Sequence, residues 1–214
     1  MTPLRREHRL VTVEGGEGAG KSTVLAALRA CLQDAGAQVT CTREPGGTPL
    51  AERIRDLLLD PDAEPASPHT ELLLMFAARA QHVQRVLLPA LARGDWVLSD
   101  RFTDSSHAYQ GGGRGLSRQD IDLLEGHFVG IEPGLTLLLD VDLALAQERL
   151  RARDAQPDRM ERERGEFHQR VRAAFLARAR ECPQRIHVLD ASQPAAVVAA
   201  QAVAVLSRHL QARQ

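Results

Sequence analysis

Short apolar runs alternate with amphipathic segments along the whole chain. Apolar or β-branched runs typical of buried strands occur at residues 8–14, 38–42, 96–99, 135–141 and 186–189. Apolar residues at helical spacing occur over residues 21–35, 49–59, 67–92, 117–128, 142–153, 166–181 and 194–210. Strands that alternate with helices are typical of a parallel β-sheet flanked by helices on both faces. We therefore expect an α/β fold, with residues 1–214 forming a single domain.

Composition narrows the function classes. The 27 basic and 28 acidic residues give a net charge of -1, which argues against a nucleic-acid partner and against binding to an anionic membrane surface. No apolar run approaches the roughly 20 residues that a membrane span needs. The cysteines are Cys31, Cys41 and Cys182. An odd number without close spacing argues against a disulfide framework or a zinc site, and favours a reducing, cytoplasmic location.

A phosphate-binding motif follows the first predicted strand. Residues 15–22 read GGEGAGKS, which is G-x-x-x-x-G-K-S between a strand and a helix. Such a P-loop cradles phosphates with its backbone N–H groups, and Lys21, the single lysine of the chain, would reach the β- and γ-phosphates. Ser22 would bind Mg²⁺ through its hydroxyl group. The expected ATP-binding residues here are Gly15, Gly16, Glu17, Gly18, Ala19, Gly20, Lys21, Ser22 and Thr23.

Three further polar clusters follow predicted strands. TREPGGT at 42–48 follows the second strand, and Asp100 and Arg101 follow the third. YQGGGR at 109–114 is predicted to form a glycine-rich turn that carries polar side chains. Because ligands of open α/β sheets bind at the carboxyl ends of the strands, we expect these clusters to share one cleft with the P-loop.

Together these motifs resemble the thymidylate kinase family, which has a P-loop NTPase fold. The matching segments are EGGEGAGKST, TREPGGTPLAERIR, LLLMFAARAQ, SDRF, SSHAYQGGGRG, LTLLLDV and RARDAQPDRME, in the family's order and over nearly the whole chain. The resemblance implies transfer of a phosphoryl group from ATP to dTMP, giving dTDP and ADP for dTTP synthesis. It also implies Mg²⁺ as cofactor, a homodimer, and no nucleic-acid or membrane partner.

The resemblance also implies roles for the residues near the transferred phosphate. Arg101 would bind the acceptor phosphate together with Arg55, for which Arg43 is an alternative. Asp100 would lie near Mg²⁺, where the family uses an acidic group that often contacts the ion through water. Glu17 would contact the sugar 3′-hydroxyl or a group near it.

The base pocket is implied in the same way. Arg79 would bind a carbonyl group of thymine. The stacking residue would be Phe76, three positions before it, with Met75 as the alternative. Ser105, Ser106, Tyr109 and Gln110 would line the sugar and base of dTMP.

The segment from about 149 to 165 resembles the family's lid, and we call it the lid. In the bacterial subtype the lid supplies a catalytic arginine, which neutralises charge on the transferring phosphoryl group. Arg153 is the expected catalytic arginine. Arg149, Arg151 and Arg159 are expected to contact ATP.

Three other activities are compatible with a P-loop. A kinase for a different nucleoside monophosphate would use the same phosphate sites with another base pocket. A regulatory ATP-binding module would have no need of Arg55, Arg79 and Arg101 around a second phosphate site. An ATPase that acts on nucleic acid is disfavoured by the near-neutral charge and by an aromatic content of 3%.

Overall fold

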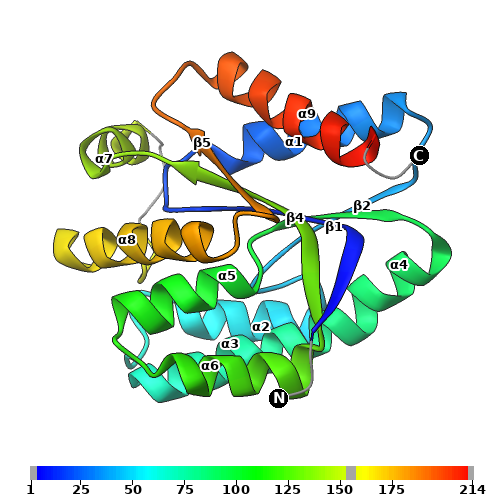
Figure 1. The fold of residues 1–214 in the computed structure, drawn as a ribbon. Helices are drawn as coiled ribbons and strands as arrows, with labels where there is room; N and C mark the ends of the chain where they lie inside the picture. Colours follow the sequence, from blue (N-terminus) through cyan, green and yellow to red (C-terminus); the bar gives the residue numbers. More distant parts are fainter. Residues whose placement is uncertain (1–3, 153–157, 212–214) are drawn as a thin grey trace.

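The computed structural model describes residues 4–152 and 158–211, and a five-stranded sheet forms its centre (Figure 1). The strands are β1 Arg5–Gly15, β2 Val39–Arg43, β3 Trp96–Asp100, β4 Ile131–Asp140 and β5 Ile186–Asp190. They run in the order β2-β3-β1-β4-β5, and every neighbouring pair is parallel. The predicted parallel α/β fold is confirmed.

The strand order creates the position for a ligand. β1 lies in the middle, with β3 on one side and β4 on the other, so the chain leaves the sheet in both directions from this point. Val13 of β1 is in register with Asp100 of β3, and Asp100 is in register with Arg43 of β2. The carboxyl ends of these three strands therefore meet at one edge, where a cleft forms in open α/β sheets.

Helices cover both faces of the sheet. On one face α1 Lys21–Asp34 and α9 Ala195–Gln211 pack together over the strands. The other helices are α2 Pro49–Leu59, α3 Pro68–His82, α4 Leu88–Arg93, α5 Thr103–Ser106, α6 Arg118–Leu124, α7 Leu143–Arg151 and α8 Gly165–Glu181. Of these, α4, α5 and α8 contact the opposite face of the sheet. Within the described ranges, no helix combines the length and apolar character that a membrane span requires.

Local sequence signals explain where several helices begin. The side chains of Thr48, Ser67 and Asp142 each accept a hydrogen bond from a backbone N–H group in the first turn of α2, α3 and α7. Ser117 precedes α6 and is a residue type that often caps helices, but its side chain makes no capping hydrogen bond.

The long helix predicted at 67–92 is continuous but not uniform. It consists of α3, the π-helical segment η1 Val83–Leu87, and α4. Pro89 lies in the first turn of α4 and lacks the N–H group that an α-helix would use there. A wider π-turn just before the proline accommodates this missing donor.

The prediction of a glycine-rich turn at 109–114 was wrong. Residues His107–Gly113 form the π-helical segment η2, which continues α5 and packs against α8. A Cβ atom at Gly112 would lie 2.4 Å from Cβ of Ala174, and one at Gly113 would lie 2.5 Å from the ring of Phe167. These two glycines therefore serve the close approach of two helices rather than a turn.

Candidate active site

The P-loop joins β1 to α1. Gly18 and Gly20 have φ angles of 74° and 90°, which residues other than glycine rarely adopt. Lys21 is the first residue of α1 and only 9% exposed, and its Nζ donates to the carbonyl oxygens of Gly16 at 3.1 Å and Gly15 at 3.4 Å. Burial lowers its pKa, and the nearby charge of Arg101 adds to this effect. The single lysine is thus held against the loop, where phosphate oxygens can replace the carbonyl groups.

A cavity of about 490 Å³ adjoins the P-loop at the carboxyl edge of the sheet. Residues from the P-loop, α2, α3, β3, α5 and η2 line it, so the fold brings together segments far apart in the sequence. Of the expected site residues, Glu17, Gly18, Gly20, Lys21, Ser22, Arg55, Arg79, Asp100, Arg101, Ser105, Ser106, Tyr109, Gln110 and Arg149 line this cavity. The expected ATP-binding residues Gly15 and Gly16 line a separate cavity of about 70 Å³.

A further cavity of about 200 Å³ lies beside the P-loop. Its wall contains the two remaining P-loop residues of the prediction, Ala19 and Thr23, together with Gln193 near the C-terminal helix. Gly20 and Arg149 line both this cavity and the large one. The two cavities therefore adjoin at the end of the P-loop.

Arg101 links the P-loop to the residues after β3. Its backbone has a φ of 71°, and its guanidinium donates to the carbonyl oxygen of Gly15 at 2.9 Å and to the hydroxyl of Tyr109 at 3.0 Å. It also forms an ion pair with Glu17. Burial alone would raise the pKa of Glu17, but the charges of Arg101 and Lys21 lower it to about 2. The carboxylate is therefore ionised and holds Arg101 beside the P-loop.

Asp100 and Ser22 offer oxygen ligands to the same cavity. Oδ1 of Asp100 is buried and has no hydrogen-bond partner among the described residues. A buried carboxylate oxygen without a hydrogen-bond partner costs free energy, so we expect a cation or a water molecule to bind it. Hydroxyl and carboxylate oxygens are the ligands that Mg²⁺ prefers. The two residues therefore fit the expected magnesium ion.

Arg79 is fixed from three sides. It is 3% exposed, and its Nε donates to Glu44 at 2.6 Å while its other nitrogens donate to Ser106 and to the carbonyl oxygen of Phe102. Burial alone would raise the pKa of Glu44, but Arg79 and His82 lower it, so the carboxylate stays charged. The sequence analysis assigned no role to Glu44, although it lies inside the TREPGGT motif.

The residue beside the base pocket differs from the first expectation. Met75 lines the large cavity, whereas Phe76 is 3% exposed and belongs to a hydrophobic cluster with Leu72, Val83 and Phe102. The ring of Phe76 packs against the Arg79 guanidinium, 4.8 Å from the ring centroid, but Phe76 does not line the cavity. The geometry thus favours the alternative, Met75, as the side chain that a bound base would meet.

Both candidates for the second acceptor arginine reach the cavity. Arg55 is half-buried and donates to the carbonyl oxygen of Pro45 at 3.0 Å. Arg43 is exposed and pairs with Glu52 at 2.8 Å. Arg55 is therefore the less exposed of the two candidates.

The lid arginines separate into different environments. Arg149 lines both cavities and donates to the carbonyl oxygen of Ala191 at 2.9 Å. Arg151 is exposed at the end of α7. Arg159 pairs with the buried Glu71 at 2.7 Å and does not line the P-loop cavities. Arg153 lies outside the described residues.

The sequence analysis also assigned no role to the buried carboxylates Glu14 and Glu71. Glu14, at the end of β1, accepts from Ser105 at 2.6 Å and from the backbone N–H of Phe102 at 2.7 Å. Burial and the charge of Asp104 raise its pKa to about 8. Glu71, on α3, contacts three polar side chains from other segments. A charged residue within an otherwise apolar strand or helix face was the available signal.

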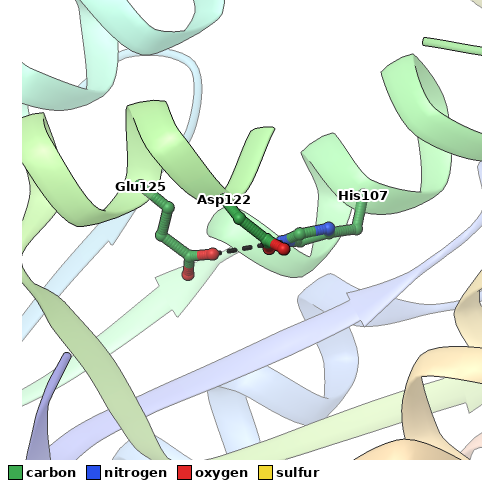
Figure 2. Close-up of side chains that lie close together, drawn as sticks. All are labelled: His107, Asp122 and Glu125. Atoms are coloured by element: carbon green, nitrogen blue, oxygen red, sulfur yellow. Dashed lines mark hydrogen bonds and ion pairs between the residues drawn. The ribbon is translucent and has the colours of Figure 1, made fainter. Parts of the chain in front are cut away.

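Another cluster of ionisable side chains lies outside the cavities. Figure 2 shows His107 of η2 beside Asp122 and Glu125, the latter two on α6 and the π-helical segment η3 Glu125–Val129. The Nε2 atom of His107 lies 3.1 Å from Glu125 and 3.8 Å from Asp122. Burial alone would raise the pKa of Glu125, but its hydrogen bond with His107 lowers it. An ion pair between the two helical stretches accounts for this cluster.

Comparisons with known proteins agree with the geometry. Residues 13–202 match the family model of thymidylate kinase. The chain is 52% identical to the thymidylate kinase of Chromohalobacter salexigens over 98% of both chains, and 55% identical to that of Pseudomonas entomophila over 88% of this chain and 90% of the relative. A crystal structure of thymidylate kinase from Ehrlichia chaffeensis superposes with a TM-score of 0.75 at 32% identity, covering 94% of this chain and 99% of that one. The chain belongs to the thymidylate kinase family.

Proposed function

We propose that this protein transfers the γ-phosphoryl group of ATP to dTMP, giving dTDP and ADP in the synthesis of dTTP. The observation that carries the proposal is one cavity lined both by the P-loop residues Lys21 and Ser22 and by Arg55 of α2 and Arg101, which follows β3. A nucleotide-binding switch needs only the first pair. Two sets of phosphate-binding groups in one cavity support transfer between two phosphates.

The residues supply positioning and charge rather than a general base. The acceptor oxygen belongs to a phosphate that is already an anion, so no proton need be removed before it attacks. Arg55 and Arg101 would hold the acceptor phosphate in line, and Lys21 would hold the donor phosphates. Mg²⁺ held by Ser22 and Asp100 would offset phosphate charge. Contact with the acceptor sugar remains our proposal for Glu17.

The cavity of about 200 Å³ supports a place for the ATP base. It adjoins the P-loop on the side of Ala191 and Gln193, and Arg149 lies between it and the large cavity. This placement supports our proposal that Arg149 contacts ATP. Arg153 stays our proposed catalytic arginine of the lid, and the roles of Arg151 and Arg159 at ATP remain predictions.

We further infer a homodimer. Leu73, Leu123 and Phe128 are 58%, 46% and 56% exposed on α3, α6 and η3, and η3 packs against α3. Large apolar side chains grouped on neighbouring helices favour burial against a second copy. Leu73→Glu should shift the mass measured by analytical ultracentrifugation from dimer to monomer. The three unpaired cysteines support the proposed cytoplasmic location.

The decisive experiment is a coupled assay of ADP release with dTMP, dUMP, dCMP and AMP as acceptors. We expect dTMP to be the best acceptor and dUMP a weaker one, because one methyl group in an apolar pocket contributes only about 1–3 kcal/mol. Lys21→Ala serves as the control for contaminating kinases. Equal activity on AMP and dTMP would contradict the proposal and favour a general nucleoside monophosphate kinase.

A further inference from the structure

Glu71 is a buried carboxylate that none of the proposed chemical steps uses. It lies on α3 and is 0% exposed. Burial by itself would raise its pKa, but hydrogen bonds from Arg114, Gln110 and Arg159 lower it. The carboxylate is therefore ionised, and both of its oxygens can only accept hydrogen bonds.

One partner of Glu71 belongs to the acceptor pocket. Nε2 of Gln110 donates to Oε1 of Glu71 at 2.9 Å, and Gln110 lines the large cavity. Because the carboxylate cannot donate, it fixes which end of the Gln110 amide faces it. The carbonyl oxygen of Gln110 is thereby left as the group available to a base in the cavity. A carbonyl oxygen accepts from the N3–H of thymine, whereas N3 of cytosine carries no hydrogen.

Glu71 has two further partners: Arg159, which belongs to the lid, and Arg114, which forms an ion pair with the lid. Nη2 of Arg159 donates to Oε2 of Glu71 at 2.7 Å, and Nε of Arg159 donates to the carbonyl oxygen of Leu58 at 2.7 Å. Arg114 donates to Glu71 at 3.0 Å and pairs with Glu163 of the lid at 2.6 Å. Met160 lies between Arg159 and Glu163 in the sequence. It is buried and lines the same cavity as Gln110.

We propose that Glu71 is a positioning residue that joins the lid to the acceptor pocket and favours pyrimidines with an N3–H group. Its carboxylate anchors lid residues 158–163 through Arg159 and Arg114, which places Met160 in the pocket wall. The same carboxylate orients the amide of Gln110. The effect on acceptor choice rests on the proposed function, whereas the anchoring of the lid does not.

Limited proteolysis tests the anchoring without any activity measurement. Trypsin must take the side chain of Arg159 into its own pocket to cut the Arg159–Met160 bond, and the ion pair with Glu71 withholds this side chain. We expect Glu71→Gln to be cut at this bond at least about tenfold faster than the wild type, because a neutral amide removes the charge that pairs with Arg159 and weakens its hold. Mass spectrometry of the fragments identifies the bond that is cut.

Glu125→Gln is the matched control. Glu125 is also a buried carboxylate in an ion pair, but it lies in the cluster of Figure 2, on η3. Its replacement should leave cleavage at Arg159 within about threefold of the wild type. Equal acceleration in both variants, or no acceleration in Glu71→Gln, would overturn the anchoring. If Glu71→Gln does not fold, Arg159→Gln should instead speed cleavage after Arg164, and unchanged cleavage there would also overturn it.

Acceptor discrimination provides the second readout. In Glu71→Gln the new amide can donate as well as accept, so the Gln110 amide is free to turn its NH₂ group toward the base. The ratio of kcat/KM for dTMP over dCMP should fall at least about tenfold, mainly through the dTMP KM. An unchanged ratio would overturn the role in orientation. Absence of dTMP kinase activity in the wild type would instead refute the proposed function and leave the proteolysis result standing.

Discussion

Replacing Gly112 by alanine probes the packing of the helical stretch that carries Tyr109 and Gln110. Gly112 lies in η2 where α8 packs against it, and a Cβ atom there would lie 2.4 Å from Cβ of Ala174 and 3.2 Å from the carbonyl oxygen of Arg170. Neither of these atoms can be moved by rotating a side chain. The two helices must therefore separate to admit the methyl group.

The size of this effect follows from the distances. Ordinary contact begins at 3.4 Å, so the helices must shift by about 1 Å. Overpacking of this kind costs about 1–3 kcal/mol, and we take the upper end because backbone must move. Alanine recovers up to about 1 kcal/mol through its higher helix propensity. The net loss of unfolding free energy is about 2 kcal/mol, or about 4–8 °C in Tm for a chain of this length.

Gly111→Ala is the matched control. Its Cβ would meet the flexible Cδ1 atom of Ile121 at 3.3 Å, which a few tenths of an ångström relieve. This variant should be as stable as the wild type or slightly more stable. Thermal unfolding followed by circular dichroism measures both variants, and the dTMP KM should rise only for Gly112→Ala. Equal Tm values for the two variants would refute the packing argument.

Three further predictions concern single residues of the site. Lys21→Ala should lower kcat by at least about a hundredfold with an unchanged circular dichroism spectrum, and near-normal turnover would contradict its phosphate contact. Arg149→Ala should lower kcat more than it raises the dTMP KM in steady-state kinetics, and the reverse pattern would contradict a role at the donor phosphates. Burial and the charge of Asp104 raise the pKa of Glu14 from 4.5 to about 8, so the folded state binds this proton more tightly than the unfolded state. The Glu14 contribution to stability should therefore be lost as pH rises from about 4.5 to 8, and urea unfolding of Glu14→Gln should show a flatter pH dependence over this window.

Much of the fold and the position of the site could be predicted from the sequence alone. Strands and helices follow from the spacing of apolar residues, and Ser67 and Asp142 mark helix starts through contacts only three residues away. The P-loop is equally local, because its glycines, lysine and serine are consecutive. Alternating strands and helices then require a parallel sheet, whose carboxyl edge gathers the polar clusters.

Other features depend on partners that lie far along the chain. The sequence suggests a turn at Gly112 and Gly113, and only the contact with α8 explains why these residues are glycine. Met75 and Phe76 are adjacent apolar residues, and only the tertiary structure shows that Phe76 packs in the core while Met75 lines the cavity. Glu71 finds its partners 39 to 88 positions away.

Local spacing thus determined the secondary structure and the P-loop, because the interactions that form them span only a few residues. Tertiary packing decided which face of each helix meets the cavity and which buried carboxylate holds which arginine. A charged group leaves water only where distant partners satisfy it, and those partners are set by the assembled fold.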